Sequence, residues 1–181
     1  AAGSTVKSLA DMLTSELEIC TPPKQLIEHV ASLNSEDELA NIIANGDKEA
    51  LEAFMWGRDT LDLLEMAGNG AISADELVSF LKPLQHRAYS ISSSPKAQEG
   101  EGHLTGAAVR WQANGREHKG VCSTYLADQI AEGDNARIFF SPNKNFRIPE
   151  NNDAPMIMVG PGTGVAPFRA FLEERQAIGA G

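Results

Sequence analysis

The chain has 181 residues, of which 42% are hydrophobic and 22% charged, a composition typical of one large globular domain or two small ones. Its 25 acidic and 15 basic residues leave a formal net charge of -10, and such a surface disfavours nucleic acid and anionic membranes as partners. No apolar run approaches the roughly 20 residues of a membrane-spanning helix. We therefore expect a globular protein with no nucleic-acid partner and no membrane segment.

Cysteine and histidine spacing predicts no metal site. Cys20 and Cys122 are far apart, and the four histidines form no close pair. A reduced, cytoplasmic protein is the natural expectation, although two cysteines are also compatible with an oxidising compartment. The first residues lack the basic start and apolar stretch of a signal peptide.

Residues 1–82 are predicted to form a helical segment, because apolar residues recur at three- and four-residue spacings. The positions that define the successive helices are Val6, Leu9, Leu13 and Leu17; Leu26, Ile27 and Val30; Leu39, Ile42 and Ile43; Leu51, Phe54, Met55 and Leu61; and Leu77, Phe80 and Leu81. In the fourth set, the apolar spacing predicts one continuous helix that runs from Leu51 through Leu61 and ends at Gly68–Gly70.

Breaks and caps divide this helical segment. Prolines 22 and 23 and Pro83 interrupt the pattern, because proline lacks an amide donor. Asn45–Gly46 and Gly68–Gly70 are expected to end helices. Two capping-box patterns, Ser35 with Glu38 and Ser73 with Glu76, predict helix starts.

Residues 83–152 change character and predict short strands. The expected strands or extended segments are His86–Ser92, His103–Gln112, Ala136–Ser141 and Phe146–Pro149. Asn114–Gly115 is a hairpin turn signal. Gly120–Thr124 leads into a predicted short helix that carries Leu126 and Ile130.

Residues 153–181 predict the opening of a nucleotide-binding βα unit. Met156–Val159 is a continuous apolar run, typical of a strand buried on both faces of a parallel sheet. The glycine-rich turn Gly160–Gly164 follows, and apolar spacing from Val165 onward predicts a helix. One strand and one helix cannot complete a doubly wound sheet, so we expect its other strands beyond the last residue.

Three segments carry groups that suit a phosphate-bearing aromatic ligand. In Arg87–Ser90, an arginine can hold phosphate, a tyrosine can stack on a ring and a serine can form a hydrogen bond. Gly120–Thr124 and Gly160–Gly164 each precede a helix N-terminus, which favours anions. Each segment also has a structural alternative: an exposed strand, a helix cap and a tight turn, respectively.

Taken together, the three segments resemble the motifs of a known family. Arg87–Ser94 is similar to the Arg-x-Tyr-Ser flavin motif of the ferredoxin–NADP reductase superfamily, and Gly120–Thr124 resembles its second flavin motif. Met158–Arg169 is similar to its nicotinamide-nucleotide motif. The helices before residue 84 resemble the connecting domain of the diflavin reductases, and residues 103–111 and 143–147 are closest to bacterial sulfite reductase flavoproteins.

The resemblance implies a multi-domain α+β fold. A helical connecting-domain segment would span residues 1–82, an antiparallel β-barrel flavin domain 83–152, and a truncated Rossmann-like NADP-binding domain 153–181. Gly106 stands where a larger apolar residue is expected in such a strand.

The resemblance also implies residue roles. Arg87 would bind FAD phosphates, Tyr89 would stack on the flavin ring, and Ser90 would act near the flavin atom that receives hydride. The remaining implied cofactor residues are Thr105, Ala107 and Trp111 beside the flavin, Gly120, Val121, Cys122, Ser123 and Thr124 at the pyrophosphate, and Gly162, Thr163, Gly164 and Pro167 at NADPH.

The implied function is that of a flavoprotein reductase. Hydride would pass from NADPH to FAD, and electrons would leave through FMN, held by a domain outside this chain, to a haem or iron–sulfur partner such as the sulfite reductase haemoprotein. A single-flavin reductase with a helical extension and a non-catalytic flavin-binding fragment remain alternatives.

Overall fold

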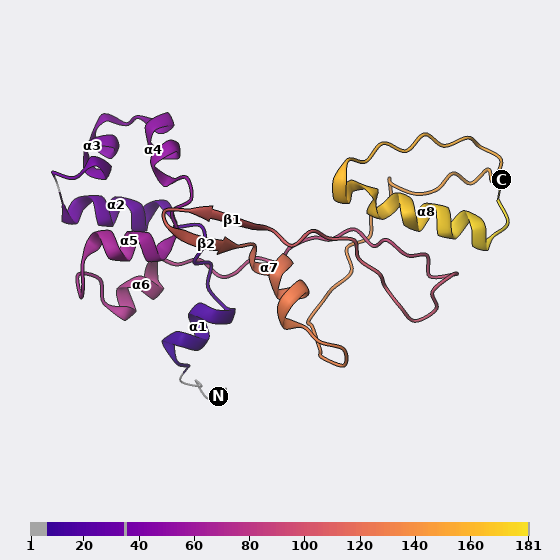
Figure 1. The fold of residues 1–181 in the computed structure, drawn as a ribbon, viewed down its shortest axis with the longest axis horizontal. Coiled ribbons are helices and arrows are strands. Elements are labelled where there is room, and N and C mark those ends of the chain that lie inside the picture. Colours follow the sequence, from indigo (N-terminus) through magenta and orange to yellow (C-terminus); the bar gives the residue numbers. More distant parts are fainter. Residues whose placement is uncertain (1–6, 35, 181) are drawn as a thin grey trace. The chain divides into compact units, whose positions relative to one another are not determined.

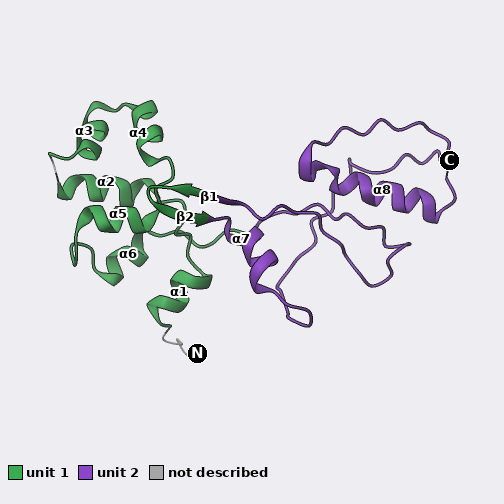
Figure 2. Cartoon of the chain, in the orientation of Figure 1, with its two compact units in different colours: residues 1–86, 112–118 green, residues 87–111, 119–181 purple. Residues whose placement is uncertain are grey.

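The computed structural model describes residues 7–34 and 36–180 of an α+β chain (Figure 1). The chain divides into two compact units. Unit 1 contains residues 1–86 and 112–118, and unit 2 contains residues 87–111 and 119–181 (Figure 2). None of the helices in the described ranges is long and apolar enough to cross a membrane.

Unit 1 contains the predicted helices. Their bounds are α1 Leu9–Ser15, α2 Lys24–Leu33, α3 Glu38–Asn45, α4 Lys48–Met55, α5 Thr60–Ala67 and α6 Ala74–Phe80. The second capping box is confirmed, because Ser73 Oγ accepts a hydrogen bond from the Glu76 N–H at 3.3 Å and the Glu76 carboxylate accepts one from the Ser73 N–H at 2.9 Å. Val6 and Ser35 lie outside the described residues, and α3 has Asp37 as its N-cap.

The predicted continuous helix through Leu51 and Leu61 is wrong, because α4 ends at Met55 and α5 begins at Thr60. Gly57 between them has a φ of +70°, a backbone conformation that favours glycine. Asp59 then starts α5 with a capping box, in which its carboxylate accepts the Asp62 N–H and the Asp62 carboxylate accepts the Asp59 N–H. Local capping therefore overrides the apolar register.

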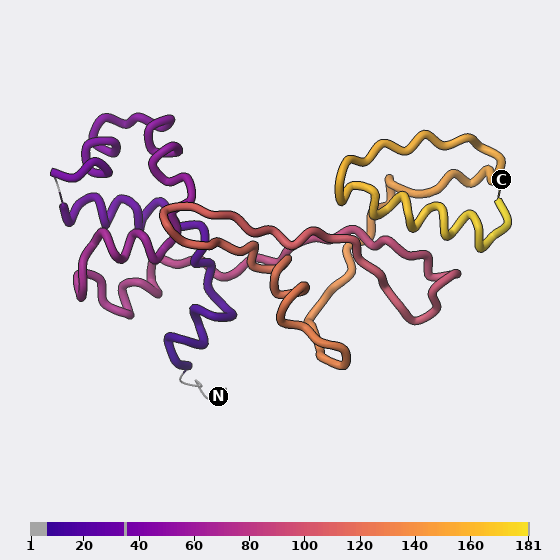
Figure 3. Tube along the Cα trace, viewed as in Figure 1, coloured from indigo at the N-terminus to yellow at the C-terminus, as the bar shows by residue number. Residues whose placement is uncertain are grey.

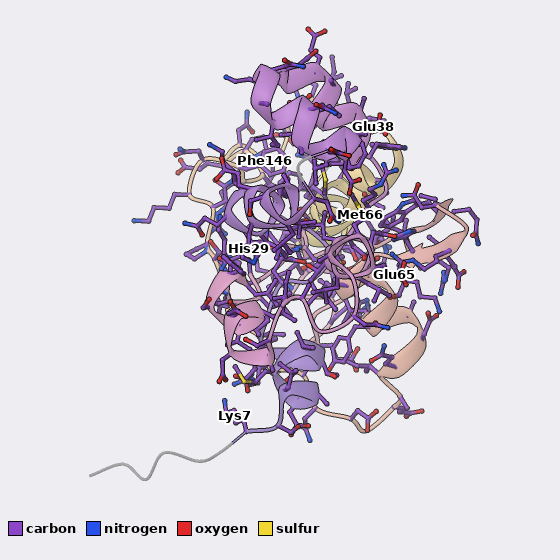
Figure 4. All side chains as sticks on the ribbon, turned by 90° about the vertical axis from the view of Figure 1, so that its left-hand side faces the viewer. Lys7, His29, Glu38, Glu65, Met66 and Phe146 are labelled. Carbon is purple, nitrogen blue, oxygen red and sulfur yellow. The ribbon has the colours of Figure 1, made fainter. Side chains whose placement is uncertain are left out.

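The core of unit 1 forms around α2. This helix contacts α3, α5 and α6 (Figure 1). Leu26, Leu39 and Leu63 are at most 1% exposed, and burying each such side chain contributes about 1.5–3 kcal/mol. At the edge of this core, the ring of His29, labelled in Figure 4, lies 5.0 Å from the ring of Phe80.

A β-hairpin tip completes unit 1. Strands β1 (Arg110–Ala113) and β2 (Arg116–Lys119) form a two-stranded sheet. Asn114 and Gly115 have φ values of 48° and 74°, which confirms the predicted tight turn. The Asn114 side-chain amide donates to the Gly57 carbonyl at 2.8 Å. A Cβ on Gly57 would lie 2.4 Å from Ala113 Cβ, so only glycine permits this approach.

The hairpin tip also carries an ion-pair network. Arg116 Nη2 lies 3.0 Å from Asp59 Oδ1 and 2.6 Å from Asp62 Oδ2. His118 is buried, with Nδ1 3.6 Å from Asp59 Oδ2. Burial by itself would raise the pKa of Asp62, but the hydrogen bond and charge of Arg116, with the Asp59 N–H, outweigh burial and hold that pKa below its ordinary value. The network fastens the tip to the N-terminus of α5.

Unit 2 contains two turn-and-helix segments. The helical pieces are α7 Val121–Thr124, continued by a π-helical turn η1 Tyr125–Gln129, and a 3-10 turn η2 Gly162–Val165, continued by α8 Ala166–Ala177. The helices predicted after the two glycine-led turns are therefore confirmed.

The predicted strands of this part are mostly absent from the described residues. In the segment expected as a strand at His86–Ser92, one isolated β-bridge pairs Ile91 with Leu104. The strand expected at His103–Gln112 is regular only from Arg110. Ala136–Ser141 and Met156–Val159, whose course can be followed along the tube in Figure 3, are not assigned as strands. The burial expected for the latter segment is wrong, because Ile157 is 95% and Val159 81% exposed.

The physical reason is that a strand requires a hydrogen-bonded neighbour. Within the ranges that the structure describes, β1 and β2 are the only named strands. The described residues therefore do not confirm the expected barrel or parallel sheet.

Replacing Arg116 by alanine should lower the free energy of unfolding by about 1–2 kcal/mol, because two shielded carboxylates lose their shared cation. Chemical unfolding followed by circular dichroism measures the change. As a control, Arg110→Ala removes an exposed ion pair with Asp128 and should cost less than about 1 kcal/mol.

The pH dependence tests the same network. Because the pKa of Asp62 is lowered by folding, its contribution is present above the ordinary aspartate pKa and is lost as the pH falls through the lowered value. Arg116→Ala should weaken this acid sensitivity, and an unchanged profile would contradict the role given to the pair.

Candidate functional site

A groove in unit 2 brings together residues from the first two predicted motifs. It has a volume of about 290 Å³ and is lined by Tyr89, Leu104, Gly106, Ala107, Ala108, Ser123, Leu126 and Ala127. Tyr89 comes from the first motif, Ser123 from the second, and Ala107 from the segment between them. A larger opening of about 440 Å³ in unit 1 contains none of the predicted cofactor-binding residues. It is lined by Phe54, Arg58, Asp62, Glu65, Met66 and Asn114.

Tyr89 forms one wall of this groove. Its ring lies next to Gly106, where an added Cβ would lie 3.4 Å from Tyr89 Cε1, at ordinary van der Waals contact. Gly106, Ala107 and Ala108 line one side of the groove with small side chains, which leaves room for a flat ligand.

Tyr89 of the first motif also interacts with the Cys122 thiol of the second. Burial and then this thiol raise the pKa of Tyr89 above its ordinary value, while the charge of Arg87 opposes the shift. Burial and the thiol together favour the neutral phenol. Sequence spacing gave no sign of the Tyr89–Cys122 interaction, since 33 positions separate the two residues.

Arg87 and Ser90 lie on either side of Tyr89 in the chain, and both are exposed. The influence of the Arg87 charge on Tyr89 places the guanidinium within electrostatic range of the groove. Ser90 does not line the groove. Of the three polar groups predicted in this motif, the structure therefore brings Tyr89 into the groove and leaves the other two in solvent beside it.

The turn at Gly120 is built by close backbone packing. The Gly120 N–H donates to the Val109 carbonyl at 2.9 Å, and the Val109 N–H donates to Ser123 Oγ at 3.1 Å. A Cβ on Gly120 would lie 2.6 Å from Ser123 Oγ and 3.1 Å from Val109 Cβ. Glycine is required here for close approach of the two segments.

The hydroxyls of this turn serve the turn itself. Ser123 Oγ and Thr124 Oγ1 both donate to the Gly120 carbonyl, at 3.2 and 3.0 Å, and Thr124 is buried. This arrangement matches the helix-capping alternative for these two side chains. The first N–H groups of a helix have no partner within it, so backbone amides are what the start of α7 can offer an anion.

The other predicted flavin residues are distributed around the groove. Ala107 lines it, and Thr105 is half-buried next to that wall. Val121 is exposed at the start of α7. Trp111, on β1, is 40% exposed.

The second turn, at Gly160–Gly164, leads into α8. Gly162 has a φ of +56°, and Pro167 lies in the first turn of α8. Thr163 and Gly164 are exposed beside the helix N-terminus, the favoured end for an anion.

Gly160, the first glycine of this turn, was not among the predicted cofactor-binding residues. A Cβ there would lie 2.5 Å from the Gly164 carbonyl oxygen and 2.6 Å from the Phe168 ring. The signal that could have identified it is its place as the first glycine after an apolar run, where a turn folds back on its helix.

The groove thus combines an aromatic wall, a low wall of small residues and a nearby glycine-led helix start, a set that fits a planar ring attached to phosphates. In the part of the chain with described positions, no group of three or more His, Cys, Asp or Glu residues could hold a metal ion.

Comparison with known proteins gives a consistent result. The sequence profile of the FAD binding domain family matches residues 3–125. The sulfite reductase (NADPH) flavoprotein alpha-component of Bacillus subtilis (strain 168) is 46% identical over 97% of this chain. The proteins of the same name from Zymomonas mobilis and Serratia proteamaculans are 44% and 39% identical over 95% and 96%. The chain spans 28–29% of the length of these relatives.

Replacing Cys122 by alanine should lower the pKa of Tyr89 toward its ordinary value of about 10 without restoring it fully, because burial is the larger cause of the shift. The chain has two tyrosines, so ultraviolet titration of tyrosinate in a Tyr125→Phe background reports on Tyr89 alone. Cys20→Ala, at an exposed cysteine, is the matched control and should change nothing. A Tyr89 pKa that is insensitive to Cys122→Ala would show that the thiol contact does not form.

Proposed function

Because this chain belongs to the FAD binding domain family, we propose that it is the FAD-binding part of an NADPH-dependent flavoprotein reductase. In this proposal hydride passes from NADPH to FAD, and electrons leave through FMN to a haem or iron–sulfur partner. The observation that carries the proposal is the groove in which Tyr89, Ala107 and Ser123 meet. Bound flavin would supply the redox chemistry, and the residues of this chain would bind and orient it.

Tyr89 would stack its ring on the flavin, since it forms the aromatic wall of the groove. Arg87, exposed beside it, would pair with the FAD phosphates. Ser90 would donate a hydrogen bond at the flavin atom that receives hydride. Its exposure in this structure supports access from the solvent side, where the nucleotide would arrive.

The start of α7 would hold the FAD pyrophosphate through backbone amides. Gly120 permits the close approach, and Ser123 and Thr124 brace the turn by their hydrogen bonds to the Gly120 carbonyl. Their role in this proposal is therefore to shape the turn, with Val121 and Cys122 contributing N–H groups at the helix start. Thr105 and Trp111 would border the flavin on the side of Ala107.

The turn before α8 would bind NADPH. Gly162, Thr163 and Gly164 offer an uncrowded backbone at the N-terminus of a 12-residue helix, and Pro167 fixes its first turn. This arrangement suits the pyrophosphate of a dinucleotide.

We also propose the finer architecture: a helical connecting domain over residues 1–82, a flavin β-barrel over 83–152 and a Rossmann-like nucleotide domain from 153. The exposed apolar side chains of Phe139, Phe140, Ile157 and Val159 support it, because neighbouring strands would bury them. The relatives are longer than this chain, which supports the proposal that a longer polypeptide supplies those strands.

For the whole protein we propose a cytoplasmic flavoprotein that passes electrons to a sulfite reductase haemoprotein. The names of the relatives support the acceptor, and Cys20 and Cys122, which are not joined in a disulfide, suit a reducing compartment.

The full-length flavoprotein should show a visible flavin spectrum that anaerobic NADPH bleaches. A colourless protein, or one whose flavin NADPH leaves oxidised, would overturn the proposal and favour a non-catalytic module. The FAD-to-FMN ratio separates the remaining alternative: we expect a value near one, and FAD alone would indicate a single-flavin reductase.

Two substitutions should separate binding from chemistry. Arg87→Ala should weaken FAD binding about 10- to 100-fold, the loss of one charge-assisted contact. Ser90→Ala should retain FAD but slow its reduction by NADPH roughly 100-fold. Arg137→Ala and Ser141→Ala, at exposed positions outside the groove, are matched controls. Stoichiometric FAD in Arg87→Ala, or an unchanged rate in Ser90→Ala, would refute the corresponding role.

A further inference from the structure

Three consecutive serines after the Tyr89–Ser90 segment are unusually buried. Ser92, Ser93 and Ser94 are 0%, 4% and 1% exposed, although serine is mostly found at the surface. Buried polar groups need hydrogen-bond partners, and an unmade bond costs the full desolvation of the group. Where these serines find their partners therefore constrains the segment.

Two of these serines are tied to the neighbouring extended segment. The Ser92 N–H donates to the His103 carbonyl at 2.8 Å, and the His103 N–H donates to Ser93 Oγ at 2.9 Å. This places the serine row beside the chain that leads, from Leu104 to Ala108, into the wall of the groove.

Ser92 and Ser94 also contact α8. The Ser94 N–H donates to Glu173 Oε2 at 2.9 Å, and the Ser94 hydroxyl donates to the Glu174 carboxylate. Arg169 Nη1 lies 3.4 Å from Ser92 Oγ, and its Nη2 lies 3.2 Å from Glu173 Oε1. We name this set, Ser92, Ser94, Arg169, Glu173 and Glu174, the serine clamp.

The charges of the clamp are held in place. Lys96 Nζ lies 2.7 Å from Glu174 Oε1. The hydrogen bonds of Lys96 and Ser94 hold the pKa of Glu174 below its ordinary value, so the carboxylate stays ionised. The side chains of Glu173 and Glu174 are each 19% exposed, which protects both contacts from full solvent screening.

Within unit 2, the clamp connects the segment proposed to hold the flavin with the helix that follows the proposed nucleotide turn. Ser92 follows Ser90 by two positions, whereas α8 begins directly after the turn of Gly162–Val165. Its hydrogen bonds also span residue 152, where the two proposed domains meet. The turn that would hold the nucleotide is thus fastened to the segment that would hold the flavin.

We propose that Glu173 and Arg169 are positioning residues for hydride transfer, which fix the nucleotide turn relative to the flavin segment through Ser92 and Ser94. This inference rests on the proposed function. Neither residue need touch substrate or cofactor. A misplacement of about 1 Å between reacting groups is enough to slow a reaction about 100-fold, so a loosened clamp would affect the rate more than binding.

The experiment uses the full-length flavoprotein and compares Glu173→Ala, Glu173→Gln and Gln176→Ala. Glutamine keeps an oxygen that can accept the Ser94 N–H, whereas alanine does not. Gln176 is an exposed residue of the same helix and is the matched control. The measurements are FAD content, the dependence of flavin reduction on NADPH concentration, and the limiting rate of reduction.

We expect Glu173→Ala to retain FAD and a nearly unchanged half-saturating NADPH concentration while its limiting rate falls about 10- to 100-fold. Glu173→Gln should recover most of the rate, and Gln176→Ala should match the wild type. A wild-type rate in Glu173→Ala overturns the inference. So does a loss of FAD or of NADPH affinity equal to the loss of rate, since that indicates a structural role only.

A second variant covers failure to fold. If Glu173→Ala yields no folded protein, Ser94→Ala removes the contact of the Ser94 hydroxyl with Glu174, together with its local bond from the Lys96 N–H, and the same separation of rate from binding decides the outcome. The wild-type measurement separates a failure of the proposed function from a failure of the clamp inference. Wild-type protein without NADPH-reducible FAD refutes the proposed function, whereas reducible wild-type protein with unaffected clamp variants refutes this inference alone.

Discussion

The close approach of Val109 and Gly120 is the constraint on which the groove depends. The Gly120 N–H donates to the Val109 carbonyl, and the Val109 N–H donates to Ser123 Oγ, so the two segments meet through hydrogen bonds at one point. A side chain at 120 would collide with both. This closure brings the start of α7 beside the wall of Gly106–Ala108, and it places Cys122 where its thiol can reach the Tyr89 hydroxyl.

Different interactions stabilise the interior of each unit. Unit 1 buries leucines from α2, α3, α5 and α6 in a common core, and burial of apolar area is its main source of stability. Unit 2 has Ala166 as its buried apolar residue, while Ser92, Ser93, Ser94 and Thr124 are buried through hydrogen bonds. Such contacts are directional, so they specify geometry more than they add net stability. That balance suits a part of the molecule in which loops must be held in a defined arrangement.

The candidate site illustrates how function can depend on residues that carry no chemistry. Tyr89 is the group that would meet the flavin, while Gly106 lies against its ring and Cys122 interacts with its hydroxyl. In the same way, Gly160 allows the second turn to fold back on Phe168. Around Phe168, Phe146 and Phe171 lie with ring centroids 5.1 to 6.3 Å apart, which packs the preceding loop on α8.

The sequence by itself determined the features that depend on neighbouring residues. Helical spacing, the Ser73–Glu76 capping box, the Asn114–Gly115 turn and the helices after both glycine-led turns were all predictable, because each is set by residues within a few positions. The three motifs identified the family for the same reason, since each is a short run of adjacent residues.

Only the tertiary structure decided which distant residues meet. The close approach of Gly57 to Ala113, the Arg116 pairs with Asp59 and Asp62, the Tyr89–Cys122 contact and the serine clamp each join segments that spacing does not relate. The strands expected at Ala136–Ser141 and Met156–Val159 show the converse: an apolar, extended run has the composition of a strand, but pairing is a property of its neighbours. Contacts across long separations depend on chain closure and packing, which local residue patterns do not encode.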